Sequence, residues 1–297
     1  MDIQILARQF CDDSKYLKGY SPMTLRRYRQ VIGFFGRFAG IEDVSQITHN
    51  KVKELFIHGR TVRKWSANTF ICYHKTLAVF FRWCIKEGHM QANFTDDIEI
   101  PKLEKRLPPK LTKQDAMRLL EVAYNYPYDY HFLRYRNHAI FATFLFAGLR
   151  KKELLQLKLA DVDLENLTIY VRQGKGSKDR IIPMSYRLAD ILNRYMKERR
   201  RLNKTCPGFF ASLNHNQGLT EISLKRLVDK MRVASEIEFT IHKLRHTFAT
   251  LMLEGGCDIF SLSKMMGHSD IKTTTIYLAA SAEHLRAQIV KHPLNNI

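Results

Sequence analysis

The 297-residue chain has few cysteines, a shortage of acidic side chains and no long apolar run. Its cysteines are odd in number, widely spaced and without a CxxC pair, which argues against a disulfide framework and for reduced thiols: Cys11, Cys72, Cys84, Cys206 and Cys257. Together with the missing signal peptide, this pattern predicts a cytoplasmic protein. No apolar stretch approaches the length of a membrane span, so we expect no membrane partner.

The shortage of acidic residues leaves the chain strongly basic. It has 48 lysines and arginines against 29 aspartates and glutamates, a net charge of +19. Residues 1–106 contain 18 basic and 11 acidic side chains and the remainder contains 30 and 18, so the excess is not confined to one tail. A polyanion contacted along the whole chain, DNA or RNA, is the favoured partner, and a basic but merely solvated surface is the alternative.

The first third of the chain, residues 1–96, is predicted to be a helical domain. Ser21 begins a helix that ends near Gly40, and two further helices are expected over 48–57 and 67–86. Their apolar and aromatic side chains recur every three or four residues, which is typical of core-facing stripes. The basic side chains outside these stripes are candidates for DNA contact, with a solvated face as the alternative for each: Arg26, Arg27, Arg63, Lys64, Lys75 and Arg82.

A charged linker with three prolines, residues 97–111, leads to a larger domain, residues 112–297. In this domain two β-branched segments flank a basic, glycine-rich tip and predict a β-hairpin over 167–184. Amphipathic patterns predict the helices of the larger domain, at 112–123, 135–146, 151–157, 188–200, 222–234, 242–254 and 259–266. We therefore expect a mainly α fold (α+β) with one small β-sheet or hairpin.

The segment 242–277 contains the side chains with the clearest chemistry. His242 and Arg245 are three residues apart, so on a helix they project from one face. A glycine turn then precedes His268, and Tyr277 follows two helical turns later. An arginine and two histidines near one tyrosine hydroxyl suit the attack of a tyrosine on a phosphodiester.

A metal site and a phosphate-binding loop are two other interpretations of these residues. His242 and His246 have the spacing of two helical zinc ligands, but Lys243 stands where a metalloprotease has glutamate, and Arg245 would oppose a cation. The glycine-rich tip around Lys175 lacks the earlier glycine and the following Ser or Thr of a phosphate-binding P-loop. We therefore expect neither a metal nor a cofactor.

Five motifs occur in a fixed order and are together much more specific than any one of them: AGLRKKEL at 147–154, GKGSKDRIIP at 174–183, HKLRHTFAT at 242–250, MGHSDIKTT at 266–274 and Tyr277. In this order they resemble the signature of the tyrosine recombinase (phage-integrase-like) family, most closely its Xer branch. The resemblance covers nearly the whole chain. It implies an N-terminal core-binding (SAM-like) helical domain and a C-terminal catalytic domain that together form a C-shaped clamp on duplex DNA.

The resemblance also implies the catalytic residues, with Tyr277 as nucleophile: Arg150, Lys175, His242, Arg245, His268 and Tyr277. Two arginines would bind the non-bridging phosphoryl oxygens with planar, permanently charged donors. His242 is the candidate base, Lys175 the implied acid for the leaving 5′ oxygen, and His268 a hydrogen-bond donor to the phosphate. His246 is expected to be buried and structural, and Glu153 to hold a catalytic partner in place.

The implied activity is site-specific recombination through a 3′-phosphotyrosyl intermediate and a Holliday junction, without ATP or metal. The protein would be monomeric or weakly oligomeric when free, and four protomers would act on two DNA sites, with the tail 280–297 docked on a neighbouring subunit or on its own domain. A second recombinase or an accessory protein would be a further partner. Dimer resolution and movement of a mobile element remain open as roles. The alternatives are an inactive DNA-binding regulator and a type IB topoisomerase.

Overall fold

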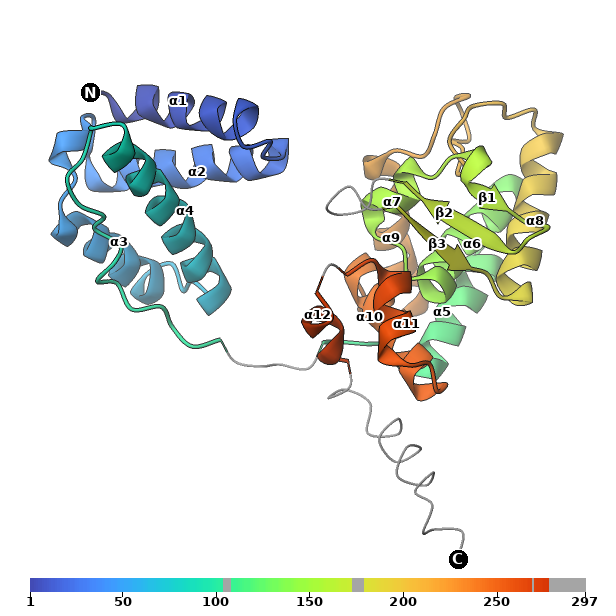
Figure 1. The fold of residues 1–297 in the computed structure, drawn as a ribbon. Coiled ribbons are helices and arrows are strands. Elements are labelled where there is room, and N and C mark those ends of the chain that lie inside the picture. Colours follow the sequence, from blue (N-terminus) through green and yellow to red (C-terminus); the bar gives the residue numbers. More distant parts are fainter. Residues whose placement is uncertain (104–107, 173–178, 269, 278–297) are drawn as a thin grey trace, which may run out of the picture. The chain divides into compact units, whose positions relative to one another are not determined.

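The computed structural model describes residues 1–103, 108–172, 179–268 and 270–277. The chain divides into two compact units, Met1–Lys105 and Arg106–Ile297 (Figure 1). Within the described residues, no helix is both long enough and apolar enough to cross a membrane.

The N-terminal unit is helical, as predicted, and its first helix is one that the sequence patterns did not place. Its helices are α1 (Ile3–Tyr16), α2 (Pro22–Ala39), α3 (His49–Thr61) and α4 (Ala67–Lys86), with a short 3-10 turn at Val44–Gln46. The hydroxyl of Ser21 caps α2, and Gly40 ends it in the left-handed conformation. The unpredicted α1 begins at Asp2, whose carboxylate accepts hydrogen bonds from the first-turn backbone.

The core of this unit is built from aromatic rings. Phe10 lies against Tyr28, Phe80 and Trp83, with ring centroids 5.1, 5.5 and 5.7 Å away. The stripe predicted on α4, which includes Phe81, faces this core. Aromatic side chains bury the most apolar area per residue, so they hold a small helical unit together efficiently.

The C-terminal unit is also mainly helical and includes a small antiparallel sheet, which confirms the predicted fold class. Its helices are α5 (Lys113–Asn125), α6 (His131–Ala147), α7 (Lys151–Gln156), α8 (Tyr186–Arg201), α9 (Glu221–Ser235), α10 (Ile241–Glu254), α11 (Ile259–Met266) and α12 (Lys272–Thr275), with a 3-10 turn at Leu159–Asp161. The strands are β1 (Val162–Asp163), β2 (Thr168–Val171) and β3 (Arg180–Pro183), in that order, with Ile169 opposite Ile182. The two-residue β1 was not predicted.

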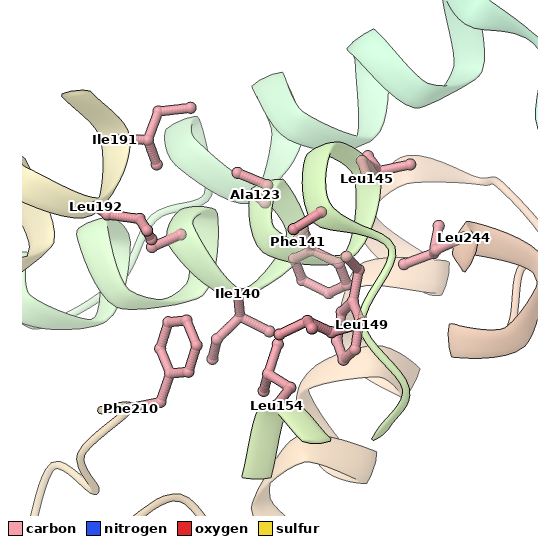
Figure 2. Close-up of a cluster of buried hydrophobic side chains, with 14 of the residues drawn as sticks. Ala123, Ile140, Phe141, Leu145, Leu149, Leu154, Ile191, Leu192, Phe210 and Leu244 are labelled. Atoms are coloured by element: carbon pink, nitrogen blue, oxygen red, sulfur yellow. The ribbon is translucent and has the colours of Figure 1, made fainter. Parts of the chain in front are cut away.

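The hydrophobic core of the C-terminal unit fixes the backbone on which the polar residues stand. Figure 2 shows side chains from α5, α6, α7, α8 and α10 gathered in this core, including Leu244 of α10, together with Leu149 from the turn between α6 and α7. Both leucines are fully buried. Arg150 and Arg245 are the next residues in the chain, so packing of each leucine sets the position of the arginine that follows it.

Candidate active site

Arg245 is the most buried of the predicted catalytic residues with a permanent charge, with only 3% of its surface exposed. Its guanidinium donates to the carbonyl oxygens of Gly148 and Met266, and one of its nitrogens lies 3.3 Å from Nε2 of His268. Burial, and then the charge of Arg150, lower the pKa of Arg245 to about 9. The guanidinium is therefore still charged at neutral pH.

Arg150 is the second cation of the site and is more accessible, with 24% of its side chain exposed. It precedes α7, where Glu153 accepts its backbone N–H at 2.7 Å. Its Nη1 donates to Glu153 Oε1 at 2.7 Å and its Nη2 to the carbonyl oxygen of Gly267 at 2.9 Å. Glu153 thus holds Arg150, one of the predicted catalytic residues, in place.

Two glycines supply carbonyl oxygens to these arginines. Gly148 ends α6 and Gly267 ends α11, both in the left-handed conformation, at φ 60° and 62°. A Cβ atom on Gly148 would lie 2.2 Å from the ring of Phe248, and one on Gly267 would lie 2.9 Å from Cδ of Arg180. Only glycine fits the backbone angle and the space at both turns.

Arg180 is a member of the site that sequence reasoning missed. It begins β3, and its Nη1 and Nη2 donate to the two carboxylate oxygens of Glu153 at 2.9 and 2.8 Å. Its Nε donates to the carbonyl oxygen of Met265 at 2.7 Å. Burial alone would raise the pKa of Glu153, but hydrogen bonds and charge from Arg180, with hydrogen bonds from Arg150, lower it to about 2. One ionised carboxylate therefore links two arginines.

Tyr277, the predicted nucleophile, is buried beside α10, with 2% of its surface exposed. Its hydroxyl lies 2.8 Å from Nδ1 of His246. Burial raises the pKa of Tyr277, while the charges of Arg245 and Arg150 act in the opposite direction. His246, expected to be buried and structural, is half-buried and hydrogen-bonded to the tyrosine.

The other two histidines flank this pair. His268 is held by Arg245 on one ring nitrogen and by the hydroxyl of Thr274, 2.8 Å away, on the other. His242 is exposed, and its ring centroid lies 4.6 Å from that of His246. Burial and nearby arginine charges lower the pKa of His242 and bring that of His268 to about 4. Each imidazole is consequently neutral at neutral pH.

An open cleft lies beside the two arginines. Arg150, His242 and Arg245 line it, together with the apolar Leu149 and Phe239 and the basic Lys225. Figure 1 shows α10, α11 and α12 gathered together next to the sheet, and α11 contacts both α12 and β3. Two guanidinium groups and neutral imidazoles lie close to a tyrosine hydroxyl. This arrangement is suited to binding a ligand with anionic oxygen atoms.

The remaining predicted site residues are not all part of this cluster. Lys175 lies outside the described residues. The six candidate DNA-contacting side chains belong to the N-terminal unit and are exposed there, which fits either DNA contact or a solvated face. Arg26 lines an open groove with Arg29 and Arg37, and the guanidinium of Arg63 lies over the ring of Phe34 at 4.9 Å. In the part of the chain that the structure describes, no three His, Cys, Asp or Glu side chains group as metal ligands would.

Comparison with known families identifies the class of protein. Residues 109–284 match the phage integrase family, and residues 6–89 match the phage integrase N-terminal SAM-like domain. The first match covers more than half of the chain, so the chain belongs to the phage integrase family. This agrees with the resemblance found in its motifs.

Individual relatives narrow the class further. Tyrosine recombinase XerC of Thermodesulfovibrio yellowstonii is 31% identical, over 98% of this chain and 97% of that protein. Tyrosine recombinase XerA of Thermococcus kodakarensis is 31% identical, over 91% of this chain and 89% of that protein. These relatives place the chain in the Xer branch, as predicted, and make it a site-specific tyrosine recombinase.

Solved structures agree on the fold. A crystal structure of XerA recombinase matches 97% of this chain and 98% of its own, with a TM-score of 0.54 and 26% identity. XerH recombinase bound to its palindromic difH substrate matches 95% of this chain and 82% of its own, with a TM-score of 0.73 and 21% identity.

Proposed function

We propose that this recombinase cuts and rejoins duplex DNA by transesterification at Tyr277. The supporting observation is that one small region brings the Tyr277 hydroxyl together with Arg150, Arg245 and His268, all connected by hydrogen bonds or by charge. Tyr277 Oη would attack phosphorus, and the 3′ phosphate would become attached to the tyrosine while the 5′ oxygen leaves.

The arrangement of donors fits the charge that this reaction creates. Negative charge grows on the two non-bridging oxygens, and Arg150 and Arg245 would each direct N–H donors to them. The network through Glu153 holds Arg150 before DNA arrives, so little reorganisation is needed. His268 would donate a further hydrogen bond to the phosphate, and Lys175 is the proposed acid for the leaving oxygen.

The energetics suit recombination without an external energy source. A phosphotyrosyl bond keeps the energy of the phosphodiester that was broken, so a 5′ hydroxyl from a second strand can reverse the step. Exclusion of water protects the intermediate from hydrolysis, and the near-complete burial of Tyr277 suits this need. His242, which lines the cleft, is the base proposed from the sequence.

We also propose the assembly by analogy with solved relatives. XerH is described bound to difH substrate, and lambda integrase as a tetramer bound to a Holliday junction. On this basis residues 1–96 and 112–297 of this chain would close around duplex DNA through the linker 97–111. Four copies would act on two sites in the cytoplasm, at the nucleoid, and the tail 280–297 would dock between them. A second recombinase or accessory protein is a further proposed partner, and the role is dimer resolution or element mobility.

Covalent trapping tests the chemistry. Wild type and Tyr277→Phe are incubated with nicked duplex fragments of the source genome in EDTA and separated on a denaturing gel. We expect a protein–DNA adduct with wild type alone. Binding without an adduct, on fragments that contain the bound site, would favour a non-catalytic regulator. An adduct with equal yield on unrelated sequences would favour a topoisomerase.

A further inference from the structure

The hydroxyl of Tyr277 has one hydrogen-bond partner within the described residues. That partner is Nδ1 of His246, 2.8 Å away, while the ring centroids of the two side chains are 5.5 Å apart. His242, one helical turn earlier on α10, has no hydrogen bond to the tyrosine in the described part of the chain. The proton acceptor nearest to the Tyr277 hydroxyl is therefore His246, a residue to which the sequence analysis gave no catalytic role.

The protonation states allow this hydrogen bond to run from the tyrosine to the histidine. A phenol is neutral at neutral pH and can donate through its O–H. Burial, and then the charges of His242 and Arg245, lower the pKa of His246 to about 4, so the imidazole is neutral. In the tautomer with the ring proton on Nε2, Nδ1 accepts from the Tyr277 hydroxyl.

We propose that His246, rather than His242, receives the proton of Tyr277 during DNA cleavage and returns it during religation. This proposal rests on the proposed function of Tyr277. As the phenolic O–H bond breaks, the proton moves to Nδ1 of His246, a P–O bond forms to Tyr277, and the P–O5′ bond breaks. The leaving 5′ oxygen takes its proton from a different acid. In religation each transfer runs backwards.

The charges around His246 explain why its proton transfer would depend on bound DNA. In the free protein, burial and the charge of Arg245 oppose a positive charge on this imidazole. A phosphodiester bound to Arg150 and Arg245 brings a negative charge into the same region and offsets that opposition. The basicity of His246 would rise when substrate is present, and Tyr277 would stay protonated otherwise.

The matched variants are His246→Asn and His246→Ala. Asparagine places an amide oxygen close to the position of Nδ1, so it can accept the phenolic hydrogen bond but cannot take the proton. Single-turnover cleavage is measured on a nicked duplex that contains the site recovered by trapping with wild-type protein. We expect both variants to be slower by about 100-fold or more, with religation slowed by the same factor. His215→Asn, which changes a histidine in an exposed loop, is the control and should cleave at the wild-type rate.

Two further measurements separate proton transfer from positioning. A 5′-bridging phosphorothiolate substrate, whose sulfur leaves without protonation, should restore a variant that lacks the leaving-group acid and leave His246→Asn slow. In ¹⁵N-histidine NMR of the free protein, the Nδ1 signal of His246 should be that of an unprotonated, hydrogen-bonded nitrogen and should shift in Tyr277→Phe.

Each other outcome overturns the proposal. A wild-type rate in His246→Asn would reduce His246 to a hydrogen-bond acceptor that positions the tyrosine. Faster cleavage in His246→Ala would make the bond a restraint on the buried nucleophile. A larger loss in His242→Asn than in His246→Asn would make His242 the base. An adduct that persists in Tyr277→Phe would instead refute the proposed function itself.

Discussion

The two units of this protein differ in what they bury. The buried polar side chains described in the N-terminal unit are uncharged: Ser14, Thr76 and Thr95. The C-terminal unit buries charged side chains as well, each no more than 8% exposed: Arg136, Glu153, Asp161, Arg199 and Arg245. A buried charge costs several kcal/mol unless hydrogen bonds and opposite charges compensate it. Folding of the C-terminal unit therefore includes a free-energy cost of burying charge that folding of the N-terminal unit, with its aromatic core, does not include.

The buried charges themselves fall into two kinds. Arg199 donates to backbone carbonyl oxygens of the loop that follows α8, including those of Cys206 and Gly208, and so stabilises that loop. Arg245 also donates to backbone carbonyls, but it lines the cleft beside Tyr277 and keeps His268 as a partner. Similar burial therefore serves structure in one case and chemistry in the other, and variants can separate the two.

The largest effect is expected from Arg245→Lys. Lysine keeps a charge but cannot bond two carbonyls and a phosphate with one planar group. Cleavage per folded molecule should fall by about 100- to 1,000-fold, in single-turnover assays at matched DNA occupancy. Arg199→Lys is the control, and it should lower the melting temperature while folded molecules keep their cleavage rate. Equal cleavage rates in the two variants would remove the distinction between the two kinds of buried charge.

The next effect concerns the pH dependence of stability. The pKa of Glu153 is lowered from 4.5 to about 2 by folding, so its contribution is present above pH 4.5 and is lost as pH falls toward 2. That shift corresponds to roughly 3 kcal/mol. Glu153→Gln should flatten the pH dependence of unfolding free energy between pH 4.5 and 3, measured by hydrogen exchange of α7 and α10. Glu165→Gln alters an exposed carboxylate and should keep the wild-type slope. An unchanged slope in Glu153→Gln would contradict the network.

A smaller effect is expected from Gly267→Ala, with Gly40→Ala of the other unit as its match. Both glycines have left-handed backbone angles, so alanine should cost about 1 kcal/mol of stability at each. A Cβ on Gly40 meets open space, whereas one on Gly267 meets Arg180. Cleavage should therefore fall only in Gly267→Ala, by roughly 10-fold, since the carbonyl that holds Arg150 is displaced. Equal cleavage rates in the two variants would show that the turn at Gly267 does not fix the position of Arg150.

The smallest effect belongs to the N-terminal surface. If Arg26 contacts a DNA phosphate, Arg26→Ala should weaken binding several-fold on any sequence and reduce the slope of log affinity against log salt by about one. Fluorescence anisotropy over a range of salt concentrations measures both quantities. A slope equal to that of wild type would identify Arg26 as part of a solvated face.

Local signals predicted the helical framework well. Capping residues and apolar spacing marked α2 and α4 closely, because helix boundaries depend on neighbouring residues. The sequence contains a signal for α1 as well, in the cap at Asp2 and the spacing of Ile3, Leu6 and Phe10. The two-residue β1 has too few side chains to produce an alternating pattern.

The site was harder to predict, because its decisive contacts join distant parts of the chain. Arg180 binds Glu153 across 27 positions, and Tyr277 bonds His246 across 31. Family motifs singled out Arg150, Arg245 and Tyr277, but spacing on a helix gave no reason to favour His246 over His242. Both project from the same side of α10, and only the tertiary position of Tyr277 distinguishes them.

The central claim is that Arg150 and the buried Arg245 of the C-terminal unit serve one nucleophile, Tyr277. The most direct test is to trap wild-type protein on cleaved DNA in EDTA, digest the complex with trypsin and nuclease, and locate the nucleotide by mass spectrometry. The account predicts a single modified residue, Tyr277, in the tryptic peptide spanning 273–286. A nucleotide attached to any other residue would contradict it.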